Sequence, residues 1–195
     1  METALTYRDI QPPFATLRFR EMSQRDLKEY SRWFHEVAPQ RIAELAEAVK
    51  QSVGYEHWFP NYTPDSLDGL SRWLATQVST RSKTEDESRE SVERLPHPEY
   101  ESNQQLTDRS ISLAFDIGMF LSEVLLRNHP SLKWGQLFGS RKSIDYGQPV
   151  LLGFRGKVPF NPVRMLTTLE YGLTRGSKTG NELREIYDIW SAMVE

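Results

Sequence analysis

The sequence TDRSISLAFDIGMFLSEVLLRN, residues 107–128, is the most apolar helical pattern in this chain of 195 residues. It begins with Thr107, whose side-chain oxygen favours a helix N-cap. Apolar residues then occur on nearly every side of the predicted helix, whereas a helix at a protein surface keeps a polar face. The pattern therefore predicts a central helix that other elements cover on several sides.

This helix is not expected to span a membrane. Its apolar part, Ile111 to Leu126, is about 16 residues long, below the roughly 20 that a bilayer requires, and contains Asp116 and Glu123. Met1 to Ala4 lack the basic and apolar regions of a secretory signal. The chain has no cysteine, so nothing in the sequence indicates an oxidising compartment. We expect a cytoplasmic protein without membrane association.

The residues before the central helix predict three further helices. After a predicted strand at 15–19, a Ser-x-x-Asp start precedes a helical pattern at 23–37. Pro39 disfavours helix at the preceding residue, so we expect a break there and a second amphipathic helix at 39–53. Thr63-Pro64-Asp65 is typical of a helix start, and the third helix follows it.

The residues on either side of the central helix have other patterns. Residues 79–105 are mostly polar and predict a linker or a solvated helix. Segments 132–138 and 149–154 predict two strands joined by a polar loop, most simply an antiparallel hairpin. Two C-terminal helices follow, one capped by Asn161-Pro162 and the other opened by Asn181.

This order of elements favours an α+β fold over a doubly wound parallel sheet. N-terminal helices and a long central helix are expected to pack with an antiparallel β-hairpin or small sheet and two C-terminal helices. The length fits a single domain, 1–195. Within it we expect a helical lobe at 1–78, a polar linker at 79–105 and a helix-hairpin-helix lobe at 106–195.

Charge is unevenly distributed along the chain. The formal net charge is −3, yet residues 133–178 contain eight basic residues and only two acidic ones. A local basic excess favours an acidic partner, and a solvated surface is the alternative interpretation. The predicted protein-binding residues flank the hairpin: Arg141, Lys142, Tyr146, Arg155 and Lys157. Aromatic residues interleave with these bases, so a nucleic-acid-binding accessory protein is a second alternative.

Asp116 and Glu123 are the leading candidates for chemistry. They are two turns apart on nearly the same face of the central helix, where a carboxylate pair could bind a small ligand, bind a metal or transfer protons. No Glu-x-x-His companion is present, and Arg127 follows Glu123 at the spacing of an ordinary helical ion pair. The four histidines occur singly, without a recognised ligand spacing. The sequence thus predicts no metal, no cofactor and no catalytic residue.

The stretch from 111 to 154 also has features in common with known proteins. It combines Ser122-Glu-Val-Leu-Leu, Leu132-Lys-Trp134 and Asp145-Tyr-Gly-Gln-Pro-Val-Leu. In these it resembles small cytoplasmic bacterial proteins of unknown function, some of which look like immunity proteins of polymorphic toxin systems. The resemblance implies a non-enzymatic protein that binds another protein, and it assigns no site residues. A small-ligand-binding protein or enzyme with a site around Asp116 and Glu123 is the first alternative.

Overall fold

The computed structural model describes residues 7–94 and 102–195, with side chains for all of these except residues 90–94. The N-terminal residues 1–4 and His97 lie outside the described residues. The longer elements are the helices α1 (Gln24–Lys50), α2 (Ser66–Gln77), α4 (Asp108–Asn128), α5 (Pro162–Thr174) and α6 (Glu182–Ala192). The short elements are β1 (Thr80–Ser82), α3 (Glu85–Arg94), β2 (Gln104–Leu106), β3 (Lys133–Gln136), β4 (Pro149–Leu152) and the 3₁₀ turn η2 (Arg155–Lys157).

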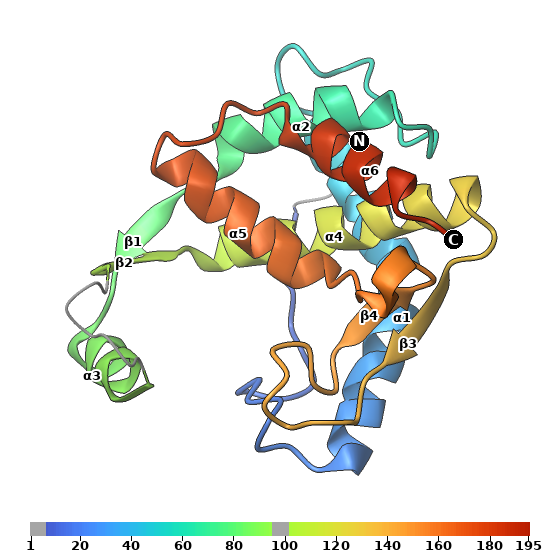
Figure 1. Ribbon diagram of the computed structural model, residues 1–195. Helices are drawn as coiled ribbons and strands as arrows, with labels where there is room; N and C mark the ends of the chain where they lie inside the picture. The colour runs from blue at the N-terminus through green and yellow to red at the C-terminus, as the bar shows by residue number, and fades with distance from the viewer. Residues whose placement is uncertain (1–6, 95–101) are drawn as a thin grey trace.

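Helix α4 is the centre of the fold, as its sequence predicts. The Thr107 hydroxyl accepts a hydrogen bond from the backbone N–H of Ser110, and nearly all residues from 112 to 125 are buried. In Figure 1, α5 crosses in front of α4 while α2 and α6 lie together above it, and α1 also packs against it. No helix among the described residues combines the length and apolar character needed to cross a membrane.

Close packing of α5 on α4 depends on Gly118. A Cβ atom at this position would lie 3.2 Å from the backbone of Pro162, the first residue of α5. The Asn161 side chain caps α5 by accepting from the backbone N–H of Arg164 at 3.0 Å, as expected from the Asn-Pro pair. Asn161 and Pro162 are buried in this contact.

The predicted hairpin is present. β3 and β4 pair antiparallel, with Trp134 opposite Leu151, although each strand is shorter than its sequence segment. Leu151 also exchanges two backbone hydrogen bonds with Phe160, which joins the hairpin to the segment before α5. The α+β class is therefore confirmed.

The break expected at Pro39 is wrong, because α1 is one continuous helix from Gln24 to Lys50. A proline removes one helical hydrogen bond, but Phe34 and Ile42 on either side of it are buried in the same core. Burial of one continuous apolar face offsets that loss. The strand expected at 15–19 is also wrong, since these residues form bends and a turn. Phe19 instead packs edge-on against Tyr30 at 5.0 Å between ring centroids.

The polar segment forms an arm on the left of Figure 1. β1 and β2 pair antiparallel, with Thr80 opposite Leu106, and α3 lies at the far end of this ribbon, away from the other helices. A solvated helix was one of the two expectations for residues 79–105, and the described part of α3 matches it: Glu85 and Asp86 in its first turn are exposed. The short strand pair was not predicted.

Candidate functional site

The structure brings Arg141 and Lys142 next to a segment that is distant in sequence. The Arg141 guanidinium donates to the carbonyl oxygen of Arg20 at 2.7 Å, and the Arg20 guanidinium donates to the carbonyl oxygen of Lys142 at 3.1 Å. All three residues are exposed. Two loops more than a hundred positions apart are thereby bonded to each other, with their positive charges at one place on the surface.

An apolar patch lies among these positively charged side chains. Ile144 is 59% exposed, and it lines a hollow of about 450 Å³ with Leu17, Phe19, Arg18, Arg20, Glu21 and Gln148. We call the set Arg18, Arg20, Arg141, Lys142, Leu17, Phe19 and Ile144 the basic surface. Exposed bases continue on the first turns of α1, where Arg25, Lys28 and Arg32 line a second hollow of about 400 Å³ with Gln24 and Glu29.

The loop that carries Arg141, Lys142 and Ile144 is fixed from beneath. The buried Asp145 carboxylate accepts from the guanidinium of Arg164 at 2.9 and 3.0 Å and from the side-chain amide of Asn161 at 3.0 Å. Gly147 has φ +68° and lies against Leu27, where a Cβ atom would be only 2.6 Å away from the leucine side chain. These contacts attach the loop to α5 and α1.

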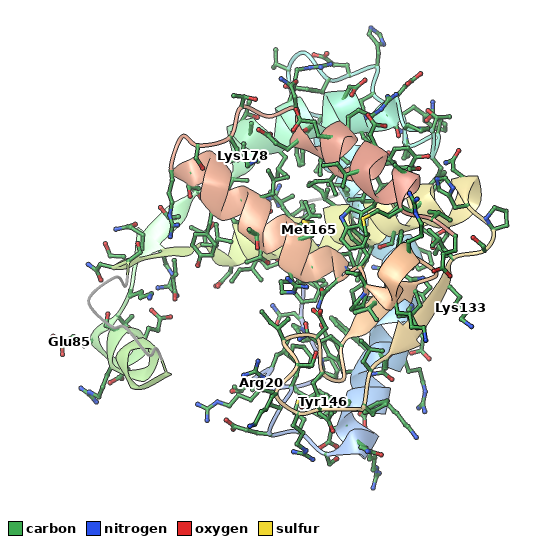
Figure 2. The ribbon with its side chains drawn as sticks, viewed as in Figure 1. Arg20, Glu85, Lys133, Tyr146, Met165 and Lys178 are labelled. Atoms are coloured by element: carbon green, nitrogen blue, oxygen red, sulfur yellow. The ribbon has the colours of Figure 1, made fainter. Side chains whose placement is uncertain are left out.

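The five predicted binding residues do not all lie together. Tyr146 is 3% exposed, so its ring supports the loop from below, and Arg141 lies 5.5 Å above that ring. Figure 2 shows Tyr146 and Arg20 at the same end of the molecule. Arg155 and Lys157 follow the other end of β4, where Arg155 donates to the carbonyl oxygen of Ala192 beside the end of α6. The basic surface therefore includes Arg141 and Lys142 but not these two.

Arg20 and Arg18 were missed by sequence analysis. They lie in the segment at 15–19 and the turn after it, where a strand was expected. Their association with the loop at 139–148 depends on tertiary contacts between distant segments, so no local signal indicates it.

Asp116 belongs to a buried ionic cluster. The Arg41 guanidinium donates to both of its carboxylate oxygens, at 2.9 and 2.7 Å, and the Tyr7 hydroxyl donates to the same carboxylate. Arg41 also donates to Glu44 at 2.9 Å. Burial raises the pKa of Asp116 to about 6, although the bonds from Arg41 and Tyr7 favour the ionised form. The cluster fixes the segment at 7–10 to α1 and α4, where Ile10 donates its backbone N–H to Ser112.

Glu123 has a different environment. Its side chain is 35% exposed and pairs with Arg127 at 3.6 Å, the helical ion pair that the sequence predicts. Glu123 lines a groove whose walls do not include Asp116. The two carboxylates thus share a helix face but have separate partners.

The described residues contain no group of three or more histidine, aspartate and glutamate side chains arranged to hold a metal ion. The ring nitrogen Nε2 of His129 is hydrogen-bonded to the hydroxyl oxygen of Ser191. No carboxylate of the described residues bonds to the other ring nitrogen. His129 and Ser191 therefore lack the third member of a catalytic triad.

A further titratable group is buried in α5. Glu170 is fully buried, and neither carboxylate oxygen has a hydrogen-bond partner among the described residues. Burial raises the pKa of Glu170 to about 9, so its carboxyl group is neutral at pH 7. Glu170 follows Leu166 by four residues, so it lies on the apolar face of α5. This spacing is the sequence feature that indicates burial of Glu170.

A scan against protein-family models, a search of curated proteins and a search of solved structures each found no match to this chain.

Proposed function

We propose that this chain is a non-enzymatic protein that binds another protein, and that the basic surface is its docking face for an acidic partner. The observation that carries the proposal is the exposed Ile144 within exposed cations from two distant loops. Protein interfaces combine an apolar centre with a polar rim. Because the loop at 139–148 is already held by Asp145, binding would order little further backbone.

The aromatic residues favour a protein partner over a nucleic acid. Nucleic-acid surfaces of this type stack bases on exposed rings. Tyr146 and Phe154 are 3% and 1% exposed, and Trp134 is half-buried against Phe34 at 5.6 Å between ring centroids.

The partner class we propose is a bacterial toxin domain, which this chain would neutralise as an immunity protein in the cytoplasm. Support comes from the resemblance of residues 111–154 to such proteins and from the absence of cysteine, which suits a reducing compartment. A neutralising protein must bind before the toxin acts. Charge complementarity mainly accelerates encounter, so a basic surface fits that requirement.

The test begins with capture of the partner from the native host, followed by association-rate measurements with the purified partner. Reversal of two charges, Arg141→Glu with Lys142→Glu, should lower the association rate about tenfold or more at low salt and weaken its salt dependence. The matched control reverses Lys133 and Lys178, which are exposed and lie away from Arg20 in Figure 2. Both variants should melt near the wild-type temperature.

Equal association rates for wild type and the Arg141–Lys142 variant would contradict the basic surface as the docking face. Coexpression with the captured partner gives a functional readout, because an immunity protein restores growth of cells that express its toxin. Failure to restore growth, with binding intact, would contradict the immunity role alone. Tight salt-sensitive binding to nucleic acid without any protein partner would favour the nucleic-acid alternative.

A further inference from the structure

Another hollow, separate from the two described above, lies between α1, α4 and β3, on residues that the basic surface does not use. This groove has a volume of about 380 Å³, near the lower end of the roughly 300–1,000 Å³ typical of small-molecule sites. Its apolar walls are Phe34, Ala38, Pro39, Ile42, Tyr62, Met119 and Trp134. Three polar residues complete it: His35, Glu123 and Arg127. Its size suits one small molecule with an apolar body.

Glu123 and Arg127 present opposite charges to this groove from successive turns of α4. Their 3.6 Å separation exceeds the roughly 2.7–2.9 Å of a strong charge-assisted hydrogen bond. Both side chains are partly exposed, at 35% and 53%. The carboxylate therefore retains capacity to accept a hydrogen bond, and the guanidinium retains N–H groups to donate.

Pro39 lies inside α1, one turn after His35. His35 and Pro39 both line the groove. The His35 ring packs on Trp134 at 4.9 Å between centroids, and burial lowers the pKa of His35, which keeps the ring neutral at pH 7.

The wall formed by Tyr62 is held in a strained conformation. Its φ angle is 60°, which is uncommon for an aromatic residue, and the side chain of Asn128 donates to its carbonyl oxygen at 3.1 Å. The Arg127 guanidinium lies 3.4 Å above the Tyr62 ring. Strained residues held by their surroundings are concentrated at binding sites. In this conformation the Tyr62 ring packs against the Arg127 guanidinium and orients it.

We propose that this groove binds a free amino acid with a large apolar side chain. The α-carboxylate would pair with Arg127, the α-ammonium with Glu123, and the side chain would pack against Trp134 and Phe34. The charges of Glu123 and Arg127 cancel, and the His35 ring is neutral, so the groove has no net charge. A zwitterionic amino acid also has no net charge. Arg127 can pair with a carboxylate through two parallel hydrogen bonds, which fixes ligand orientation.

Calorimetric titration of the full chain with L-phenylalanine, L-leucine and L-tryptophan tests the proposal. At least one should bind in the micromolar to millimolar range, and glycine should not. For the best binder, the analogue without the carboxylate and the analogue without the amine should each bind about tenfold more weakly, since each loses a hydrogen bond to a charged group. No binding of the three amino acids at millimolar concentration would overturn the proposal.

Two variants separate the roles of the charges. Glu123→Gln should weaken the amino acid about tenfold and leave the analogue without the amine unchanged. Arg127→Gln should weaken the amino acid similarly and leave the analogue without the carboxylate unchanged. The matched control is Glu47→Gln, which removes the charge from a comparable pair with Lys50 on α1, outside the groove.

Equal losses for both analogues in both variants would overturn the proposed orientation, and equal affinity in all variants would overturn the site. The Arg141→Glu, Lys142→Glu protein should bind the amino acid as wild type does. Loss of amino-acid binding in the groove variants and loss of partner binding in the basic-surface variant are thus separate outcomes.

Discussion

The guanidinium of Arg41 on α1 forms two parallel hydrogen bonds with the carboxylate of Asp116 on α4, at 2.9 and 2.7 Å. Both side chains are buried, at 8% and 0% exposure. Removal of one partner from such a buried pair typically costs about 3–5 kcal/mol, and in Asp116→Ala the Arg41 guanidinium would keep only its bond to Glu44. We expect Asp116→Ala to lose that much unfolding free energy in urea denaturation.

The double variant Arg41→Met, Asp116→Leu should be more stable than Asp116→Ala, because apolar side chains of similar size avoid burying a guanidinium that has lost its bidentate partner. Glu44 keeps hydrogen bonds from Arg8 and Gln40 in that variant. A double variant less stable than Asp116→Ala would show that the pair contributes more than the cost of burying it.

Because Glu170 is buried, we expect the free energy of unfolding to depend on pH in a specific way. Its folded pKa of about 9 is above the ordinary glutamate value of 4.5, so the folded state binds the proton more tightly than the unfolded state. Its contribution to stability is complete below about pH 4.5 and is lost as pH rises toward 9. Glu170→Gln cannot ionise and should not show this loss. Its unfolding free energy relative to wild type should rise by about 1.4 kcal/mol per pH unit from pH 5 to 8.

Urea denaturation of both proteins across this pH range provides the measurement. Glu185→Gln is the control, because Glu185 is an exposed glutamate on α6. A difference between Glu170→Gln and wild type that stays constant with pH would mean that Glu170 is ionised in the folded protein.

Phe115 and Glu123 on α4 should differ sharply in their effects on stability. Phe115 is 5% exposed and packs against Phe34 and Trp33, with both ring-centroid distances at 6.4 Å. Phe115→Ala should cost roughly 3–5 kcal/mol, as for other large-to-small changes in a core. Glu123→Gln should change stability by less than about 1 kcal/mol, because its ion pair is partly solvated. Denaturant melts that rank the two variants in the opposite order would contradict this assignment.

The arm from β1 to β2 should be the first site of limited proteolysis. Its strands have three residues each, and the described part of α3 is mostly exposed, so little apolar burial opposes local unfolding. Trypsin should cut first at Arg81, Lys83, Arg89 or Arg94, as mass spectrometry of early fragments would show. Early cleavage at Arg127, in the last turn of α4, would contradict the prediction.

Several elements could be predicted because their signals are local. Thr107 and Asn161 each cap a helix through an oxygen on their own side chain, and the hairpin at 132–154 follows from two apolar segments separated by a polar loop. The apolar pattern of α4 indicated its central position, because burial on many sides requires apolar residues on many sides. The Glu123–Arg127 pair followed from spacing within one helix.

By itself, the sequence determined the α+β class, the central helix and the basic excess at 133–178. The tertiary structure alone decided that α1 continues through Pro39, that Arg41 neutralises Asp116, and that Arg20 joins Arg141 while Arg155 lies elsewhere. The physical reason is the range of the interactions. Caps, spacing and apolar periodicity act within a few residues, whereas burial and ion pairing depend on segments that meet only when the chain has folded.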